Sequence, residues 1–302
     1  MIDLGGHRLH IVCTGKGSPT VVVENGLGDF SFDWILVQQR VARFTRICTY
    51  DRAGYAWSDP GPLPKTFSQI NLELRDALRL AGQHGKYVLV GHSYGGPVVR
   101  NFAAEYRGDV AGIVFVDAAF EGMRVGIGGK QTIRLGESGQ VREIPPPHEA
   151  MTDADRPAAP PADQLPPPEP LDAMYKVLPA AEQKLQLWAQ NLLAMQIAEQ
   201  SQREWSEVYF ARWLAKPETD PLGSIPTIVL TRAEGGYGDD QDVSAAQMEQ
   251  ERKDGQAMLG RLSTNSRQIF LKCGHNMELE DPAGVADAIG KVVEAARHGG
   301  KL

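Results

Sequence analysis

Short apolar runs recur along this chain and alternate with segments whose apolar residues follow a helical period. Each run is nearly continuous in apolar residues and rich in β-branched side chains, as expected for a strand that helices cover on both faces. The predicted strands are Thr20 to Val23, Arg46 to Tyr50, Tyr87 to Val90, Ile113 to Val116, Thr227 to Leu230 and Gln268 to Leu271. The predicted helices run from about Phe32 to Phe44, Ser68 to Ala81, Gly96 to Tyr106 and Pro282 to Arg297. This alternation predicts a parallel, doubly wound α/β sheet.

The first residues of the chain predict a separate β-hairpin. Apolar residues alternate on either side of Gly5-Gly6, and two glycines can supply the positive φ angles of a tight two-residue turn.

The alternation of strands and helices stops between Phe120 and Leu222, where no strand signal is present. Prolines crowd the stretch from Pro145 to Pro170, which excludes an interior helix or a central strand there. Ala180 to Leu214 is helical in pattern, with apolar residues near one face. We expect a cap over the carboxyl edge of the sheet, while a pair of core helices or a dimer interface stays open. The expected division is a core in 1–119, the proline-rich segment and cap in 120–222, and the second part of the core in 223–302.

Composition excludes several classes of protein. The 302 residues carry 31 basic and 38 acidic side chains, and no cluster of Lys and Arg provides a footprint for nucleic acid or an anionic membrane. No stretch approaches the roughly 18 to 20 consecutive apolar residues of a membrane span. The three cysteines, Cys13, Cys48 and Cys273, form no C-x-x-C pair. They predict buried thiols rather than a disulfide framework or a zinc site.

The amino-terminal residues lack the charged and apolar regions of a leader peptide. We therefore expect a soluble protein, cytoplasmic if the chain is complete and secreted or periplasmic if a leader was trimmed. The oligomeric state is left open.

One motif carries candidate chemistry. Gly91-His92-Ser93-Tyr94-Gly95 follows a predicted strand and opens a predicted helix. A serine on such a sharp strand-to-helix turn needs small residues two positions before and after it, and its hydroxyl is presented at a helix N-terminus, where negative charge is favoured. This context predicts that Ser93 is a nucleophile, against the alternative of an ordinary glycine-rich turn.

A serine nucleophile needs a base within hydrogen-bond reach, and His275 is the predicted base. It follows the last predicted strand, and so lies at the same edge of the sheet as Ser93. His92 adjoins the serine, but its side chain should point away from the hydroxyl. The other histidines fall in the opening hairpin, in a loop, in the proline-rich segment and in the tail: His7, His10, His84, His148 and His298.

These features together resemble the α/β-hydrolase superfamily, specifically its capped serine-esterase-like branch. The resemblance rests on Val23 to Gly28, Tyr50 to Ser58, the turn around Ser93, Val114 to Ala118 and Gly274-His275, and it fades between Phe120 and Leu222. It implies a mostly parallel, eight-stranded sheet flanked by helices, with a helical cap inserted after the strand that ends near Asp117. It also implies the chain order nucleophile, acid, histidine.

The acid partner of His275 has two candidate positions, because the superfamily places it after either of two strands. Asp117 ends the strand Ile113 to Val116 and is the preferred candidate, with a structural role as its alternative. Beyond Thr227 to Leu230, the usual spacing of the acid is disturbed. The candidates in that second position are Asp239, Asp240, Glu234 and Asp242.

The resemblance also implies an oxyanion hole made of the backbone N–H groups of Leu27 and Tyr94. The chain has Glu24-Asn25-Gly26 where the family commonly has His-Gly, which leaves the roles of Glu24 and Asn25 open. The segment Asp51 to Tyr55 is predicted to be structural, with an ion pair that braces the strand ends.

The sequence thus predicts a serine hydrolase that cleaves carboxylic esters through an acyl-enzyme intermediate, without metal or organic cofactor. The Trp and Met residues of the cap either line or cover an acyl pocket, which favours a hydrophobic acyl or aryl small-molecule substrate, or form only the core of the cap. Peptidase, lactonase, thioesterase, perhydrolase and acyltransferase activities use the same triad and stay open. Epoxide and alkyl-halide hydrolysis are disfavoured, because those family members carry a carboxylate at the position of Ser93. A ligand-binding protein of the same fold without catalysis is the second alternative.

Overall fold

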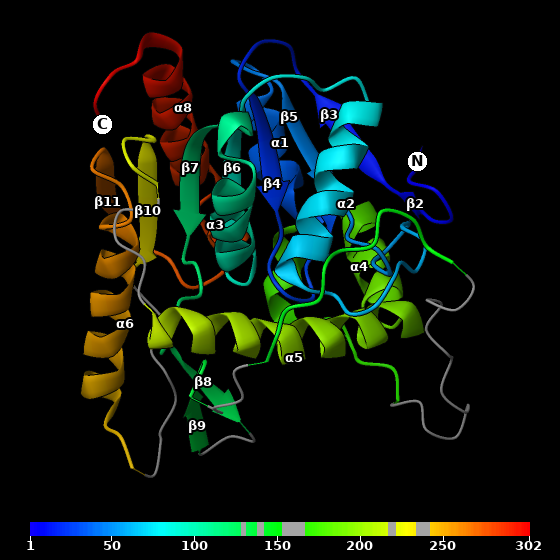
Figure 1. Cartoon of the computed structure of the whole chain (residues 1–302). Helices are drawn as coiled ribbons and strands as arrows, with labels where there is room; N and C mark the ends of the chain where they lie inside the picture. Colours follow the sequence, from blue (N-terminus) through cyan, green and yellow to red (C-terminus); the bar gives the residue numbers. More distant parts are fainter. Residues whose placement is uncertain (128–130, 138–141, 153–166, 217–221, 234–241) are drawn as a thin grey trace.

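A computed structural model of the chain describes residues 1–127, 131–137, 142–152, 167–216, 222–233 and 242–302. Its centre is a sheet of seven strands within these ranges, arranged in the order β11-β10-β7-β6-β4-β5-β3 (Figure 1). All neighbouring strands are parallel except the edge strand β3, which runs antiparallel to β5. The strands are β3 (Ile11–Thr14), β4 (Thr20–Glu24), β5 (Ile47–Tyr50), β6 (Tyr87–His92), β7 (Val110–Val116), β10 (Thr227–Arg232) and β11 (Ser266–Leu271). The six predicted strands are all present.

The sheet has one strand fewer than the eight expected, because the opening hairpin pairs with itself. Strand β1 (Ile2–Asp3) runs antiparallel to β2 (Arg8–Leu9) in a sheet of its own. The N–H of Leu4 donates to the carbonyl of His7 at 2.9 Å and closes a two-residue turn. Gly5 and Gly6 hold φ angles of 85° and 102°, as predicted for this turn.

Helices cover both faces of the central sheet. Alternate residues of β4 point to opposite faces: Val21 and Val23 pack in one apolar cluster, while Val22 packs in the other. The first face is covered by a 3-10 turn (Ser31–Trp34), α1 (Ile35–Val41) and α8 (Pro282–His298), and the second by α2 (Phe67–Leu80), α3 (Gly95–Glu105) and α6 (Ala245–Gly260). Two short helices complete this part, Arg107–Asp109 and α7 (Met277–Glu280).

The segment between β7 and β10 lies across the end of the sheet where the parallel strands finish (Figure 1). It contains a 3-10 turn (Ala173–Val177), α4 (Ala180–Ala189) and the long α5 (Leu193–Ala215). Rings of α5 pack against the start of α2: the ring centroid of Tyr209 lies 4.3 Å from that of Phe67. The segment also forms an antiparallel hairpin of β8 (Arg124–Ile127) and β9 (Gln131–Arg134), which the sequence analysis did not predict.

The proline-rich stretch lies only partly within the described residues. Residues 142–152 and 167–172 have no regular secondary structure, as the prolines predict, and 153–166 fall outside the described part.

The prediction of buried thiols was wrong for two of the three cysteines. Cys13 and Cys48 form a disulfide, and Cys273 is buried outside it. The two bonded residues are direct register partners in β3 and β5. Their pairing follows from strand register, which the spacing of cysteines along the chain does not reveal.

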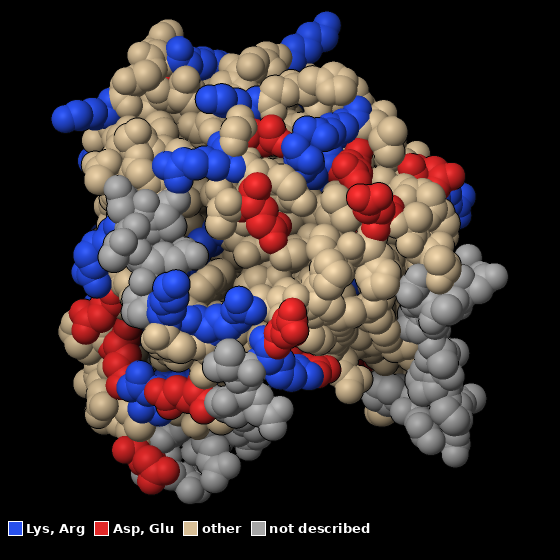
Figure 2. Space-filling view, viewed as in Figure 1, with Lys and Arg blue, Asp and Glu red and all other residues tan. Residues whose placement is uncertain are grey.

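No helix in the described residues has both the length and the apolar character needed to cross a membrane. On the face shown in Figure 2, basic and acidic side chains are intermixed, and no large area of one sign is visible.

Candidate active site

Ser93 stands at the turn between β6 and α3, as the motif predicts. Its φ is 49°, in the left-handed region that side-chain-bearing residues rarely adopt. Its N–H donates to the carbonyl of Val116 at 3.1 Å, which ties the turn to the end of β7. A Cβ added to Gly91 would collide with the main chain of Gly95, and one added to Gly95 would collide with the carbonyl of Glu24. The two glycines are therefore required for the close approach of helix and strand.

His275 is hydrogen-bonded to Asp117. The distance between Nδ1 of His275 and Oδ2 of Asp117 is 2.7 Å. His275 lies in the loop between β11 and α7, and Asp117 follows β7 directly. Asp117 has a φ of 37°, and its N–H donates to the carbonyl of Leu230 on the neighbouring strand. The bond leaves Nε2 as the ring nitrogen available to another group.

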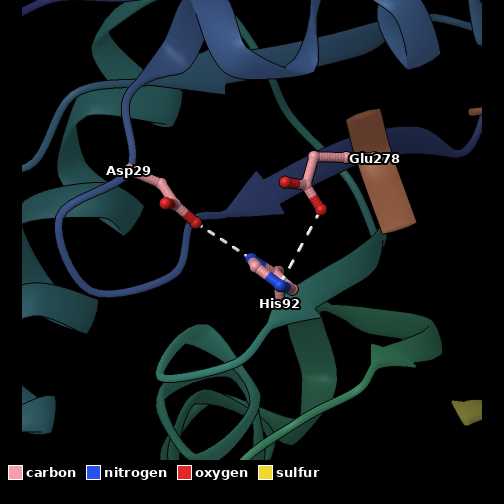
Figure 3. A group of neighbouring side chains, drawn as sticks. All are labelled: Asp29, His92 and Glu278. Carbon is pink, nitrogen blue, oxygen red and sulfur yellow. Dashed lines mark hydrogen bonds and ion pairs between the residues drawn. The ribbon is translucent and has the colours of Figure 1, made fainter. Parts of the chain in front are cut away.

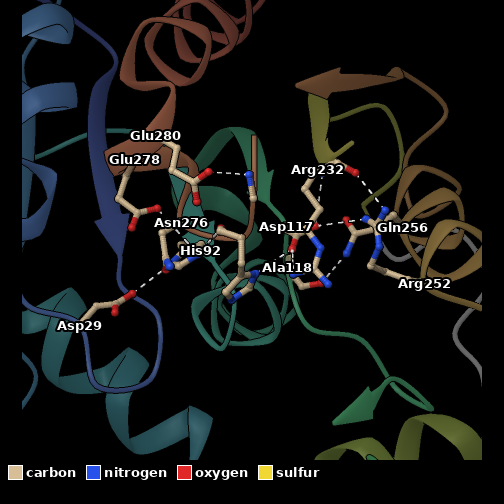
Figure 4. A network of polar contacts seen from close by, with 12 residues as sticks. Asp29, His92, Asp117, Ala118, Arg232, Arg252, Gln256, Asn276, Glu278 and Glu280 are labelled. Carbon is tan, nitrogen blue, oxygen red and sulfur yellow. Dashed lines mark hydrogen bonds and ion pairs between the residues drawn. The ribbon is translucent and has the colours of Figure 1, made fainter. Parts of the chain in front are cut away.

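Two arginines flank the carboxylate of Asp117 (Figure 4). Arg232 Nη1 lies 3.5 Å from Oδ2, and Arg252 Nη1 lies 3.6 Å from Oδ1. Burial alone would raise the pKa of Asp117, but the hydrogen bond with His275 and the nearby positive charges outweigh it and hold the pKa below its usual value. Asp117 is therefore a carboxylate beside His275 at neutral pH.

The pKa of His275 is lowered from the usual histidine value of 6.5. Burial is the largest cause, and the positive charges of His92 and Arg232 add to it, while the hydrogen bond with Asp117 opposes it. The imidazole is thus neutral at pH 7 and has the proton-accepting form that a base requires.

Ser93 and His275 line one pocket of about 600 Å³. A larger and more open hollow of about 930 Å³ lies on the outer side of α1 and α8 and contains neither residue. A second His–Asp pair, His10 with Asp51 at 2.7 Å, also lies outside the pocket of Ser93. Of these two His–Asp pairs, only the pair of His275 and Asp117 has its histidine in the pocket that Ser93 lines.

The segment between β7 and β10 supplies much of the lining of the Ser93 pocket. Its apolar and aromatic lining residues there are Leu171, Met174, Tyr175 and Met195, and its polar ones are Glu169, Asp172, Gln186, Gln190 and Glu199. Of the cap residues expected to line an acyl pocket, Met174 and Met195 do so, whereas Trp213 packs with Phe67 and Tyr209 in a buried cluster. The lining of the pocket therefore combines apolar side chains with several carboxyl groups.

The loop after β4 brings Leu27 to this pocket, and an ion pair fixes the loop. Arg52 Nε donates to Glu24 Oε1 at 2.6 Å, and both side chains are buried. The same guanidinium donates to the carbonyls of Asn25 and Gly26. This is the bracing ion pair predicted for the Asp51 to Tyr55 segment, and it gives Glu24 a structural role that the sequence left open.

Tyr94, the second residue expected in the oxyanion hole, is the N-cap of α3. Its backbone N–H is therefore at the positive end of a helix that starts beside Ser93. Asn25 also has a structural partner, because its Nδ2 donates to the carbonyl of Tyr50 at 2.8 Å.

The other candidate acids do not compete within the described residues. Asp242 is exposed, and Glu234, Asp239 and Asp240 lie outside the described part of the chain.

A buried cluster that the sequence analysis missed adjoins the site. His92 lies between Asp29 and Glu278, and all three side chains are buried (Figure 3). From the sequence, His92 was predicted only to point away from the serine hydroxyl. No local pattern could identify its partners, since Asp29 in the loop after β4 and Glu278 on α7 are both distant from His92 in the sequence.

Comparison with known proteins decides the family. The sequence profile of the alpha/beta hydrolase family matches residues 21–288. The chain belongs to this family. The match confirms the resemblance to the α/β-hydrolase superfamily and the predicted, mostly parallel sheet flanked by helices.

Proteins that are similar to this alpha/beta hydrolase in sequence or in structure are described as transporters, esterases and epoxide hydrolases. A probable transporter, efuK of Hormonema carpetanum, is 36% identical over 129 residues, which are 40% of this chain and 18% of that protein. An esterase structure from Thermogutta terrifontis is 19% identical with a TM-score of 0.60, covering 96% of this chain and 94% of that one. The epoxide hydrolase CorEH is 18% identical with a TM-score of 0.61, covering 95% and 94%.

Neither the curated relatives nor the solved structures establish the reaction of this alpha/beta hydrolase. The matched segments span less than half the length of the curated relatives. The solved structures share the fold of this chain. Because they are less than 20% identical to it, the likeness shows the fold alone. The reaction of this chain therefore depends on the residues of its own Ser93 pocket.

Proposed function

We propose that this protein is a serine hydrolase that cleaves carboxylic esters through an acyl-enzyme intermediate. The observation that carries the proposal is the 2.7 Å hydrogen bond between His275 and Asp117 at a pocket that Ser93 also lines. A carboxylate that orients a neutral imidazole beside a serine is the arrangement by which a weak hydroxyl nucleophile is activated.

Each residue has a role in the proposed reaction. Ser93 Oγ attacks the ester carbonyl while Nε2 of His275 accepts its proton, and Asp117 stabilises the imidazolium that results. His275 then returns the proton to the leaving alcohol, and the acyl group stays on Ser93. Water, deprotonated by His275, attacks this ester and releases the acid, which regenerates the serine.

The tetrahedral intermediate carries an oxyanion that needs donors. The proposed donors are the backbone N–H groups of Leu27 and Tyr94, supported by the N-terminus of α3. The Arg52 brace on the loop of Leu27 supports this proposal, because a donor held in place before the reaction is worth more than a mobile one.

Ser93 favours acyl transfer over epoxide opening. A serine oxygen that opened an epoxide would form an ether, and His275 with water has no route to cleave it. An acyl-serine is an ester and is hydrolysed by the same residues that formed it. Amides, lactones and thioesters have the same carbonyl chemistry, so the leaving group separates these activities.

We propose a neutral substrate with a hydrophobic acyl or aryl group. Leu27, Met174 and Met195 supply apolar lining beside Ser93. The carboxylates of Glu169 and Asp172 line the same pocket and would repel an anionic acyl chain.

The test is the hydrolysis of p-nitrophenyl esters of graded acyl length by the wild type, Ser93→Ala and the control Ser266→Ala, whose serine is exposed at the start of β11. A fluorophosphonate probe, which labels activated serines whatever their substrate, is applied to all three. We expect activity and labelling to be lost only in Ser93→Ala, with unchanged circular dichroism. A folded wild type that neither hydrolyses esters nor takes the label would contradict the proposal and favour a ligand-binding protein.

A further inference from the structure

His92 is enclosed by hydrogen-bond acceptors at both ring nitrogens. Nδ1 lies 2.9 Å from Asp29 Oδ2, in the loop after β4. Nε2 lies 3.1 Å from the main-chain carbonyl oxygen of His275. Glu278 Oε2, on α7, lies 3.8 Å from the same nitrogen and has no hydrogen-bond partner among the described residues. The ring thus contacts the loop after β4, the loop of His275 and helix α7 beside Ser93 (Figures 3 and 4).

These acceptors determine the protonation of the ring. A carbonyl oxygen can only accept, so Nε2 must carry a proton. A carboxylate also accepts, so Nδ1 must carry one as well unless Asp29 is protonated. The pKa of Asp29 is lowered, however: burial raises it, and the hydrogen bond with His92 and the charge of His92 more than offset that. The arrangement is that of an imidazolium with an ionised Asp29.

Asp29, His92 and Glu278 are also residue types that bind metal ions. Their geometry argues for a proton instead. Asp29 faces Nδ1 and Glu278 faces Nε2, and each ring nitrogen binds a metal ion through its own in-plane lone pair, so one ion on the ring cannot be shared by both carboxylates. The other nitrogen faces the carbonyl of His275, so its N–H is already engaged.

We propose that His92 is a positioning residue, which as a buried imidazolium fixes the backbone of His275 relative to Ser93 and to the loop of Leu27. This inference rests on the proposed function, because it assigns His275 as the base. One ring thereby connects the turn around Ser93, the loop of His275 and the loop of Leu27.

The charge of His92 has a second effect on the base. The ring centroids of His92 and His275 are 4.8 Å apart, so a positive charge on the first disfavours a proton on the second. The pKa of His92 is raised to about 10: burial lowers it, but Glu278 and Asp29 outweigh burial. His92 therefore stays charged over the range in which His275 titrates.

Other ionisable groups surround this pair. Near His92, the acidic groups of Asp29, Glu278, Asp33 and Tyr175 influence one another, and Arg52 adds a positive charge. The pKa of Glu278 is raised to about 7, with burial as the main cause and His92 opposing it. Around His275 the charged groups are Asp117, Arg232 and His92. Glu278 titrates near neutral pH, so below about pH 7 the ionised Asp29 is the group that keeps His92 an imidazolium.

The first test replaces the ring. His92→Gln removes the charge but retains a side-chain N–H donor, and His92→Leu removes both. The matched control is His298→Gln, since exposed His298 also contacts a glutamate, Glu294, but lies on α8 away from the pocket. We expect kcat to fall by roughly 100-fold in His92→Leu and less in His92→Gln, with KM changing less than kcat, because a misplaced base costs rate rather than binding.

The pH profile separates positioning from simple destabilisation. Removal of the positive charge should make His275 easier to protonate, so the acid limb of kcat/KM should move to higher pH in both His92 variants and stay in place in His298→Gln. An unmoved limb in a folded His92→Gln variant would overturn the proposal. If His92→Leu fails to fold, His92→Gln decides alone.

A second measurement needs no turnover. In protein labelled with 15N-histidine, NMR should show both ring nitrogens of His92 protonated at pH 8, in the wild type and in Ser93→Ala. NMR titration should also show a higher pKa for His275 in His92→Gln than in the wild type. These results are obtained whether or not esters are hydrolysed, so failure of the ester assay cannot be mistaken for failure of the inference. An unprotonated His92 nitrogen at pH 8, or activity lost in EDTA and restored by Zn²⁺, would refute it.

Discussion

Asp117 and His275 are separated by 158 positions along the chain, yet Oδ2 of Asp117 lies 2.7 Å from Nδ1 of His275. Parallel strand pairing brings them together. Asp117 follows β7, His275 follows β11, and β10 lies between those strands in the sheet. Because all three strands run in the same direction, their carboxyl ends meet at one edge, and residues just beyond the strands become neighbours.

Replacing Asp117 by asparagine should lower kcat by a factor on the order of 10³ to 10⁴. The amide cannot stabilise an imidazolium, and it allows the wrong tautomer of His275. The measurement is kcat on the best p-nitrophenyl ester. Asp242→Asn serves as the control, because Asp242 is exposed and should be unaffected. A comparable loss in Asp239→Asn, Asp240→Asn or Glu234→Gln, with activity retained in Asp117→Asn, would contradict this assignment. The acid partner of His275 would then be a residue that follows β10.

The wild-type pH profile should show activity that persists below the ordinary pKa of histidine. The base must be neutral to accept the serine proton, and the pKa of His275 is lowered from 6.5. Activity therefore falls only when the pH drops through that lowered value. The acid limb of kcat/KM, measured in buffers of constant ionic strength, gives the pKa directly. A limb at or above 6.5 would contradict the described environment of His275.

The Cys13–Cys48 disulfide should stabilise the fold. Its two residues are 35 positions apart, and closing a loop of that length in the unfolded chain stabilises the native state by about 3 to 4 kcal/mol. We expect the double variant Cys13→Ala/Cys48→Ala to lose about that amount in denaturant unfolding. Thiol titration of the denatured, unreduced wild type should detect one thiol, from Cys273. Detection of all three cysteines without reductant would show that the bond is absent.

Breaking the Arg52–Glu24 pair should be costly. Both side chains are buried, so Arg52→Met leaves an unpaired carboxylate and should lower the free energy of unfolding by about 3 to 5 kcal/mol. The matched control is Arg8→Met, since Arg8 pairs with Asp59 at a similar distance but is exposed, and its loss should matter little. Arg52→Lys keeps the charge but loses the fork that holds two carbonyls, so kcat should fall even where the fold survives. Equal destabilisation by the two Met variants would contradict the structural role of Arg52.

The sequence predicted the parallel core and the residues that meet at its edge. Strands of the centre are recognisable because both faces are apolar, and the glycines around Ser93 mark a close approach that only they allow. Ser93, His275 and Asp117 were found because strand order and the family resemblance place each at a strand end.

Features built from polar residues escaped the sequence analysis. Helix α6 buries Arg252 and Gln256 beside Asp117 and Ala118, so its inward face does not show an apolar period. Hairpin β8–β9 is held by Arg124 and Arg134, which both bind Glu251. Such partners lie far apart in the sequence, and only the folded chain pairs them. The same reason hid the contacts of His92.

At position 93 the stability of the fold favours glycine, whereas the proposed chemistry requires serine. A φ of 49° costs a side-chain-bearing residue on the order of 1 kcal/mol, and glycine avoids that cost. Ser93→Gly should therefore raise the melting temperature while removing the proposed nucleophile. A screen for heat resistance alone would favour this substitution, so any selection of thermostable variants of this protein has to monitor turnover at the same time.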